Sequence, residues 1–252
     1  MSFETNRRLV APRPPLPTEA EIDAVTAGIV RGAFETICYE VATHLGRCAS
    51  SAIINQSNER NASIMDGHGR LAGLSVGIPQ LLFISPLSVR YGLEHHAREP
   101  WKPGDVFVAN APEAGGGHLP DYNVYAPVFD DAGEIVVIQA LQAHQGDTGG
   151  KDPGGFSVDA QEIWAEGMII PYLQLVAEGR RREDVLATPV RHNRMPSFGG
   201  DRAAMISALE LGGRLAPWDT GEAGGFTGVF ASAGGYGSLG TPRLVLAGGH
   251  MG

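Results

Sequence analysis

Two short strings of the form His-x-x-Asp are the residues of this sequence best suited to chemistry. They are His118-Leu-Pro-Asp121 and His144-Gln-Gly-Asp147, and nearby glycines allow the backbone to approach closely. Imidazoles and carboxylates form a nitrogen and oxygen ligand set without thiolate. Such a set suits manganese, iron or zinc in a catalytic role, because structural zinc sites favour cysteine. His118, Asp121, His144 and Asp147 are therefore candidate metal ligands.

The two strings stand at the ends of a predicted β-hairpin. Its strands are expected at residues 123–129 and 134–143, joined by the turn Asp130-Asp-Ala-Gly133. With the turn centred between its second and third residues, His144 lies opposite Leu119, one place from His118. The hairpin would then bring two imidazoles and two carboxylates to one end. Spacing alone leaves a second interpretation open, in which the histidines lie near turns by chance and each aspartate caps its own loop.

The composition is typical of a globular chain with many loops. The 252 residues include 35 Gly and 17 Pro, yet 43% are hydrophobic and 19% are charged, which is enough for a sizeable core. A formal net charge of -9 argues against nucleic acid as the main partner, and the run Arg180 to Arg182 is interpreted as a solvated turn. Cys38 and Cys48 cannot form a disulfide framework.

The N-terminus lacks the layout of a secretory signal, and no apolar run reaches the roughly 18 residues of a membrane helix. We therefore expect a cytoplasmic protein with no membrane partner.

The remaining pattern predicts an α+β fold with a long N-terminal helix, a mixed, mainly antiparallel sheet and a glycine-rich C-terminal region. Thr18 and Glu21 form a capping box at the start of the long helix, and Gly46 ends it. The other expected elements are strands at 51–55, 62–65 and 106–110, a turn at 66–69, and helices at 81–99 and 201–212, the last capped by Asp201.

Several strings resemble the hydantoinase B/oxoprolinase family, the subunit type of ATP-dependent hydantoin and lactam hydrolases and of acetone and acetophenone carboxylases. The resemblance covers roughly residues 20–195. The strings that carry it, in this order, are Asp66-Gly-His-Gly-Arg-Leu71, Lys102-Pro-Gly-Asp-Val-Phe107, Asn110 with Gly116-Gly-His-Leu-Pro-Asp121, Ala143-His144 with Asp147-Thr-Gly-Gly150, and Asp159-Ala-Gln-Glu-Ile163 running to Glu166-Gly167.

The resemblance assigns His118, Asp121, His144 and Asp147 as ligands of one divalent ion, which would be Mn, Zn or Fe. It implies a metal-dependent subunit that hydrolyses a cyclic amide or carboxylates a ketone. ATP would be bound by a partner, a hydantoinase A-like ATPase subunit, so the resemblance implies a hetero-oligomer acting on a small molecule.

The resemblance also implies catalytic side chains around this centre. Glu162 and Glu166 share one face if residues 158–165 are helical, and the resemblance makes one of them either a further metal ligand or a general base that moves a proton. The alternative is a surface helix with a solvated acidic edge. Asn110 would hydrogen-bond a carbonyl group of the substrate. Trp164, between the two glutamates, is interpreted as a core residue.

Three segments are expected: a proline-rich arm at 1–17, a hydantoinase B-like metal-site domain at 18–195, and a glycine-rich segment at 196–252 that is incomplete relative to the longer family subunits. A chain shortened in this way has an alternative function as a non-catalytic interaction subunit, which would bind a partner through the arm and the long helix.

A serine hydrolase is a further alternative. Gly73-Leu-Ser-Val-Gly77 fits a nucleophile elbow around Ser75, and Asp121 and His144 follow in the order of α/β-hydrolases. Pro79 disfavours this alternative, because the elbow needs a helix immediately after the serine.

Overall fold

The computed structural model describes residues 24–75, 77–130, 132–215, 218–220 and 225–228. The predicted arm at 1–17 and the Thr18 cap lie outside the described residues, as does most of the glycine-rich segment beyond residue 215.

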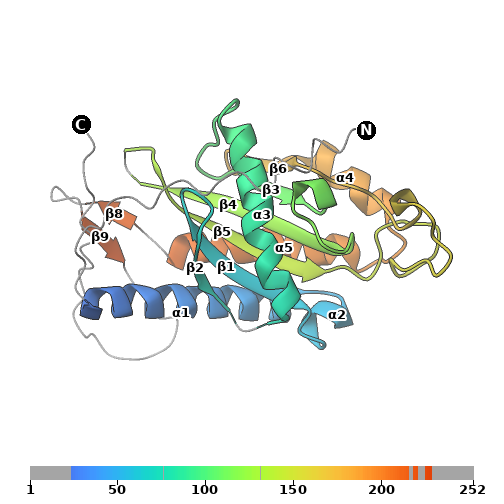
Figure 1. The fold of residues 1–252 in the computed structure, drawn as a ribbon, viewed down its shortest axis with the longest axis horizontal. Coiled ribbons are helices and arrows are strands. Elements are labelled where there is room, and N and C mark those ends of the chain that lie inside the picture. The colour runs from blue at the N-terminus through green and yellow to red at the C-terminus, as the bar shows by residue number, and fades with distance from the viewer. Residues whose placement is uncertain (1–23, 76, 131, 216–217, 221–224, 229–252) are drawn as a thin grey trace.

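Seven strands form one antiparallel sheet, which confirms the predicted α+β class (Figure 1). Their order is β2-β1-β5-β4-β3-β6-β7, so the hairpin β4–β5 lies in the middle of the sheet with a neighbour on either side. The strands are β1 (Arg60–Asp66), β2 (Leu71–Leu74), β3 (Val106–Ala109), β4 (Asp121–Phe129), β5 (Ile135–His144), β6 (Leu173–Ala177) and β7 (Arg180–Arg181). A separate two-stranded sheet pairs β8 (Trp218–Thr220) with β9 (Gly225–Gly228).

Helices cover both faces of the large sheet. The long helix α1 (Ala24–Cys48) and α5 (Phe198–Leu215) pack on one face, and α3 (Pro79–His96) crosses the other, in front in Figure 1. The shorter helices are α2 (Ala52–Asn55), α4 (Glu183–His192), and the 3₁₀ turns η2 (Pro112–Ala114) and η3 (Ile163–Ala165). Among the described residues, none of the helices combines the length and apolar character that a bilayer crossing requires.

Alternation along β4 decides which face each side chain occupies. Tyr122 and Val124 belong to the core beneath α1 and α5, whereas Tyr125 belongs to the core beneath α3. Successive strand residues point to opposite faces, so Asp121 and Asn123 share the α3 face with Tyr125. The sheet therefore turns the candidate ligand Asp121 towards α3 and away from α5.

Most predicted elements are confirmed, with ends shifted by a few residues. The strand expected at 51–55 is wrong: these residues contain the short helix α2, whose Ile54 is buried. The N–H groups of Asn55 and Gln56 bond to the carbonyls of Ser51 and Ala52. Local helical hydrogen bonds therefore satisfy the backbone of this segment despite its β-branched residues.

Asp201 has a different role from the predicted helix cap. It lies inside the first turn of α5, and its Oδ1 accepts hydrogen bonds from the N–H groups of Ser50 at 2.6 Å and Ser51 at 2.9 Å. The carboxylate is only 1% exposed. It therefore ties the start of α5 to the chain that leaves the end of α1.

We predict that Asp201→Ala lowers the free energy of unfolding by about 2 kcal/mol, because two backbone N–H groups lose a charged acceptor. Asp201→Asn keeps Oδ1 as an acceptor and should lose less than half as much. Urea denaturation followed by circular dichroism measures both values. An Asp201→Ala variant within about 0.5 kcal/mol of the wild type would show that this tie does not hold the helices together.

Candidate metal centre

The pairing of β4 with β5 places Asp121 directly opposite His144. The predicted register, with Leu119 opposite His144, is therefore wrong by two residues. The Asp130 N–H donates a hydrogen bond to the Glu134 carbonyl across the turn. The turn is therefore centred on residue 132 instead of between residues 131 and 132. A bulge between Val128 and Phe129 then shifts the register once more. The corrected register gives a closer contact between the strings, because a carboxylate and an imidazole now face each other.

Asp121 and His144 are joined by a hydrogen bond of 2.8 Å between Nδ1 of the imidazole and Oδ1 of the carboxylate. The Asp121 side chain is fully buried, and that of His144 is 16% exposed. Oδ2 of Asp121 is also buried and has no hydrogen-bond partner among the described residues. A buried carboxylate oxygen without a donor is costly, so a cation fits beside it.

His118 reaches the same place from the loop between β3 and β4. Gly115, which ends η2, adopts a left-handed φ of 82° and turns the chain towards the site. The His118 ring centroid then lies 5.4 Å from that of His144, and its Nε2 lies 3.2 Å from the Gly155 carbonyl. An Nε2–H donated to this carbonyl leaves the Nδ1 lone pair of a neutral ring free.

These three residues form the candidate centre. One ligand atom from each of His118, Asp121 and His144 lies within 4.8 Å of the others. A neutral His144 ring carries one lone pair, on Nδ1 or on Nε2 according to its tautomer, and Nδ1 is the nitrogen beside Asp121. Two neutral imidazoles and one partly unbonded, buried carboxylate fit a divalent cation by charge and by donor type.

Asp147 does not join this cluster. Its carboxylate is fully buried and accepts hydrogen bonds from the N–H groups of Gly149 and Arg194, both at 3.1 Å, and from the Arg194 guanidinium at 3.3 Å. Burial raises the pKa of this carboxyl, but the two N–H groups and the guanidinium lower it more, so the net pKa is below the ordinary value. Asp147 therefore connects the loop after β5 to the segment between α4 and α5.

Asn110 is a second predicted site residue whose polar atoms are engaged within the protein. It is fully buried, its Nδ2 donates to the carbonyls of Leu119 and Met168, and its Oδ1 accepts from the Ile170 N–H. These bonds hold the loop that carries His118. A contact between Asn110 and a substrate carbonyl stays a prediction.

Glu162 and Glu166 flank η3 instead of sharing an α-helix, so the helix considered for residues 158–165 is reduced to one 3₁₀ turn. The cause is a set of backbone bonds that tie this segment to the loop after β5, among them Lys151 N–H to the Ala165 carbonyl at 2.6 Å. Neither glutamate belongs to the candidate centre, and their proton-transfer role stays a prediction. Trp164 is 68% exposed, so its interpretation as a core residue is wrong.

Glu59 is a neighbour of the centre that sequence reasoning missed. Its Oε2 lies 3.8 Å from His144 Nδ1, and its backbone carbonyl accepts the His144 N–H at 3.0 Å. Its position depends on the pairing of β1 with β5, which sets Arg60 opposite Ala143. No local motif marks this residue, because the two strands are about 80 residues apart in the sequence.

Ser75 lacks the setting of a catalytic nucleophile. Its side chain is 2% exposed, and its Oγ accepts a hydrogen bond from the Ala62 N–H at 3.0 Å. A nucleophile elbow would instead present the hydroxyl at the surface beside a base. This geometry gives the serine hydrolase alternative no support.

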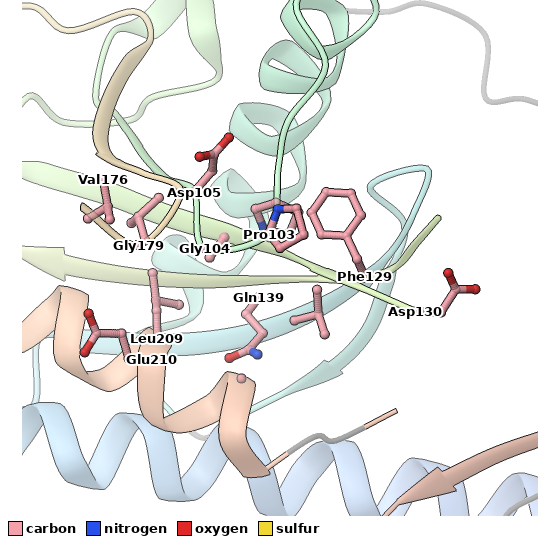
Figure 2. A pocket seen from close by; sticks show the side chains of 15 residues that line it. Pro103, Gly104, Asp105, Phe129, Asp130, Gln139, Val176, Gly179, Leu209 and Glu210 are labelled. Atoms are coloured by element: carbon pink, nitrogen blue, oxygen red, sulfur yellow. The ribbon is translucent and has the colours of Figure 1, made fainter. Parts of the chain in front are cut away.

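A cavity of about 430 Å³ lies at the other end of the hairpin, where Gln139 and Leu209 are among its lining residues (Figure 2). Gln139 faces α5, since a side chain added at Gly212 would meet its amide. Gln139 and His144 are five positions apart on β5, a distance of about 17 Å along the strand. This cavity is therefore remote from the candidate centre.

Comparison with known proteins agrees with this architecture. Residues 23–217 match the profile of the hydantoinase B/oxoprolinase family. The chain is 32% identical over 196 residues to the caprolactamase subunit beta of Pseudomonas jessenii, covering 77% of this chain and 33% of that subunit. It is 29% identical over 169 residues to the 5-oxoprolinase of Saccharomyces cerevisiae, covering 67% of this chain and 13% of that enzyme.

Solved structures show the same likeness. The ATP-dependent caprolactamase from Pseudomonas jessenii superposes with a TM-score of 0.70 at 31% identity, over 77% of this chain and 33% of that chain. A nucleotide-free acetone carboxylase gives a TM-score of 0.72 at 19% identity, over 77% and 26% respectively, and shows the shared fold. The chain thus spans a third or less of these relatives. By the family profile and the caprolactamase relative together, the chain belongs to the hydantoinase B/oxoprolinase family.

Proposed function

We propose that this chain holds one divalent ion through His118, Asp121 and His144 and supplies the metal-dependent part of an ATP-dependent enzyme. The ion would be Mn, Zn or Fe, in keeping with the nitrogen and oxygen donors. The observation that carries the proposal is the buried, unbonded Oδ2 of Asp121 beside two imidazoles. The reaction would be hydrolysis of a cyclic amide, as in the caprolactamase and 5-oxoprolinase relatives, or carboxylation of a ketone, as in acetone carboxylase.

In this proposal the protein's own groups orient the donors and move a proton. Asp121 fixes the His144 ring through Nδ1, and the Gly155 carbonyl fixes the His118 ring through Nε2. When bound, the ion would act as a Lewis acid towards a carbonyl oxygen or a water molecule. Glu59, whose carboxylate lies 3.8 Å from His144 Nδ1 and whose side chain is 35% exposed, is placed to accept a proton.

The proposed assembly is a hetero-oligomer in the cytoplasm. One relative is the beta subunit of a caprolactamase, and one structural neighbour is an acetone carboxylase whose reaction depends on ATP. The partner would be a hydantoinase A-like subunit that binds ATP. The alternative hypothesis is a non-catalytic interaction subunit. A measurement of metal binding distinguishes it from the proposed metal-dependent subunit.

We predict that the purified protein binds about one divalent ion per chain, and that His144→Ala or Asp121→Ala weakens binding by 100-fold or more. Removal of a residue that only hydrogen-bonds to a metal ligand already lowers metal affinity about 10- to 100-fold. Isothermal titration with Mn²⁺ and Zn²⁺, together with elemental analysis, provides the measurement.

His68→Ala is the matched control for this experiment, because His68 is exposed and lies in the turn between β1 and β2, where its backbone N–H donates to Oδ1 of Asp66. Its affinity should equal that of the wild type. If His144→Ala and the control retain the ion equally, the proposed centre does not exist.

A second prediction separates Asp147 from the ligands. Asp147→Asn should keep its metal affinity within about threefold, yet lose about 1–3 kcal/mol of stability, because the buried contact with Arg194 is weakened. A large loss of affinity with unchanged stability would instead make Asp147 a ligand.

The same contact predicts a pH dependence. The folded-state pKa of Asp147 is depressed, so its stabilising contribution is complete above the unfolded value of about 3.9 and declines as the pH falls towards the lower folded value. Urea denaturation between pH 2 and 6 should show a shallower acid loss in Asp147→Asn than in the wild type. Parallel pH profiles would contradict this prediction.

We further predict that ATP hydrolysis and product formation need the partner subunit, an intact His144 and a substrate carbonyl. An assay with hydantoins, lactams and small ketones identifies the reaction. Activity of the His144→Ala complex equal to that of the wild type would reject the catalytic role.

A further inference from the structure

Phe156 is an exposed aromatic residue that lies against the candidate metal centre. Its side chain is 67% exposed, yet its ring centroid lies 4.4 Å from that of His118. A single exposed phenylalanine is ordinary on a protein surface. This one contacts a candidate ligand, so it borders the space that a substrate of the centre would enter.

The backbone beside Phe156 holds its ring in this place. Gly154 and Gly155 adopt left-handed φ values of 97° and 72°, which reverse the chain at the tip of its loop. A Cβ added at Gly155 would lie 2.6 Å from Pro120, so the tip packs closely on the segment that follows His118. The Gly155 carbonyl also lies 3.2 Å from His118 Nε2. The contacts of Gly155 therefore position the Phe156 ring while leaving most of its surface accessible.

Ile84 of α3 is a second apolar group beside the centre. A Cβ added at Gly117 would lie 2.5 Å from Cδ1 of Ile84 and 3.8 Å from Oδ2 of Asp121. Ile84 is only partly buried. The carboxylate oxygen that lacks a donor therefore has hydrocarbon near it, and two separate segments, α3 and the loop of Phe156, bring apolar side chains to the centre.

The cationic side chains that flank this region are already engaged with other groups. Arg60 donates to one carbonyl of α1 and one of α2. Arg194 pairs with Asp147 at 3.3 Å, and Lys151 Nζ lies 2.6 Å from both carboxylate oxygens of Asp159. A carboxylate on the substrate would have to displace one of these partners to gain a counter-ion.

The charge of the centre also disfavours an anionic substrate. The two positive charges of a divalent ion would be balanced by the carboxylates of Asp121 and Glu59, because neutral imidazoles add no charge. The Glu59 side chain is 35% exposed beside His144, so it faces solvent and would repel an approaching carboxylate.

We propose that the centre takes an uncharged carbonyl compound whose hydrocarbon part lies on the Phe156 ring. Phe156 is then a specificity-determining residue, which favours plain lactams and ketones over cyclic amides that carry a carboxylate, such as 5-oxoproline. The inference rests on the proposed function, because the reaction class comes from it, and it divides the substrates of that class by charge.

The test is a saturation-transfer NMR titration of the full chain in excess Zn²⁺ with three related lactams. 5-Oxoproline is 2-pyrrolidone with an added carboxylate, and 5-oxoprolinamide has the same size without the charge. Both neutral compounds should bind, and 5-oxoproline should bind about tenfold or more weakly than its amide. Affinity should also rise about two- to fourfold per CH₂ from 2-pyrrolidone through 2-piperidone to ε-caprolactam.

Three results would overturn the proposal. They are binding of 5-oxoproline as tight as that of its amide, an affinity that does not change with ring size, and an absence of binding by every lactam.

Variants make the assignment to Phe156 specific. Phe156→Ala should weaken ε-caprolactam binding about fivefold or more and remove the dependence on ring size, because the apolar contact surface is lost. Phe156→Leu should restore most of the affinity. Tyr39→Ala, which truncates a 64% exposed aromatic residue of α1, is the matched control and should change neither value. If Phe156→Ala binds ε-caprolactam as tightly as the control does, the proposal fails.

The charge argument has its own variant. Glu59→Gln removes the exposed negative charge, so it should narrow the preference for 5-oxoprolinamide over 5-oxoproline by about threefold. An unchanged preference would remove the electrostatic part of the inference.

Metal affinity distinguishes failure of this inference from failure of the metal centre. Isothermal titration with Zn²⁺ should give Phe156→Ala an affinity within about threefold of the wild type, because Phe156 donates no ligand atom and no hydrogen bond. If the wild type binds no ion while lactam binding still depends on Phe156, only the metal centre is wrong. If the ion binds and Phe156→Ala leaves lactam binding unchanged, only this inference is wrong.

Discussion

The cross-strand pair of Asp121 and His144 is the contact on which the candidate centre depends. The two residues face each other on the central hairpin of a seven-stranded sheet, and their hydrogen bond of 2.8 Å orients the His144 ring beside the carboxylate. The same bond uses only one oxygen of a fully buried carboxylate. Both the orientation of the ligands and the local need for a cation thus follow from the register of β4 and β5.

The surrounding polar residues support this pair by holding loops. Asn110 bonds the loop of His118 to residues 168 and 170, and Asp147 bonds the loop after β5 to Arg194. Each has its polar atoms committed to backbone or guanidinium groups, which is typical of buried polar side chains that hold irregular segments in place. A centre built at the end of a hairpin needs such contacts, because His118 is not on a strand.

The sequence predicted those parts of the structure that depend on local pattern. The long helix, the hairpin and the antiparallel sheet follow from periodicity and turn residues, and His118, Asp121 and His144 were identified by their types and spacing. The register between β4 and β5 could not be predicted from the sequence, because no particular residue type marks the bulge between Val128 and Phe129. Glu59 and the bonds of Asp147 to Arg194 were missed because they join segments about 50 to 90 residues apart, where only the folded sheet decides proximity.

The most direct test of the account is a crystal structure of the protein grown with Mn²⁺, with anomalous scattering recorded to locate the ion. The account predicts one peak bonded to a ring nitrogen of His118, a ring nitrogen of His144 and a carboxylate oxygen of Asp121. It also predicts that Asp147 still bonds to Arg194. An ion bonded to Asp147 in place of Asp121, or no peak at the end of the hairpin, would contradict it.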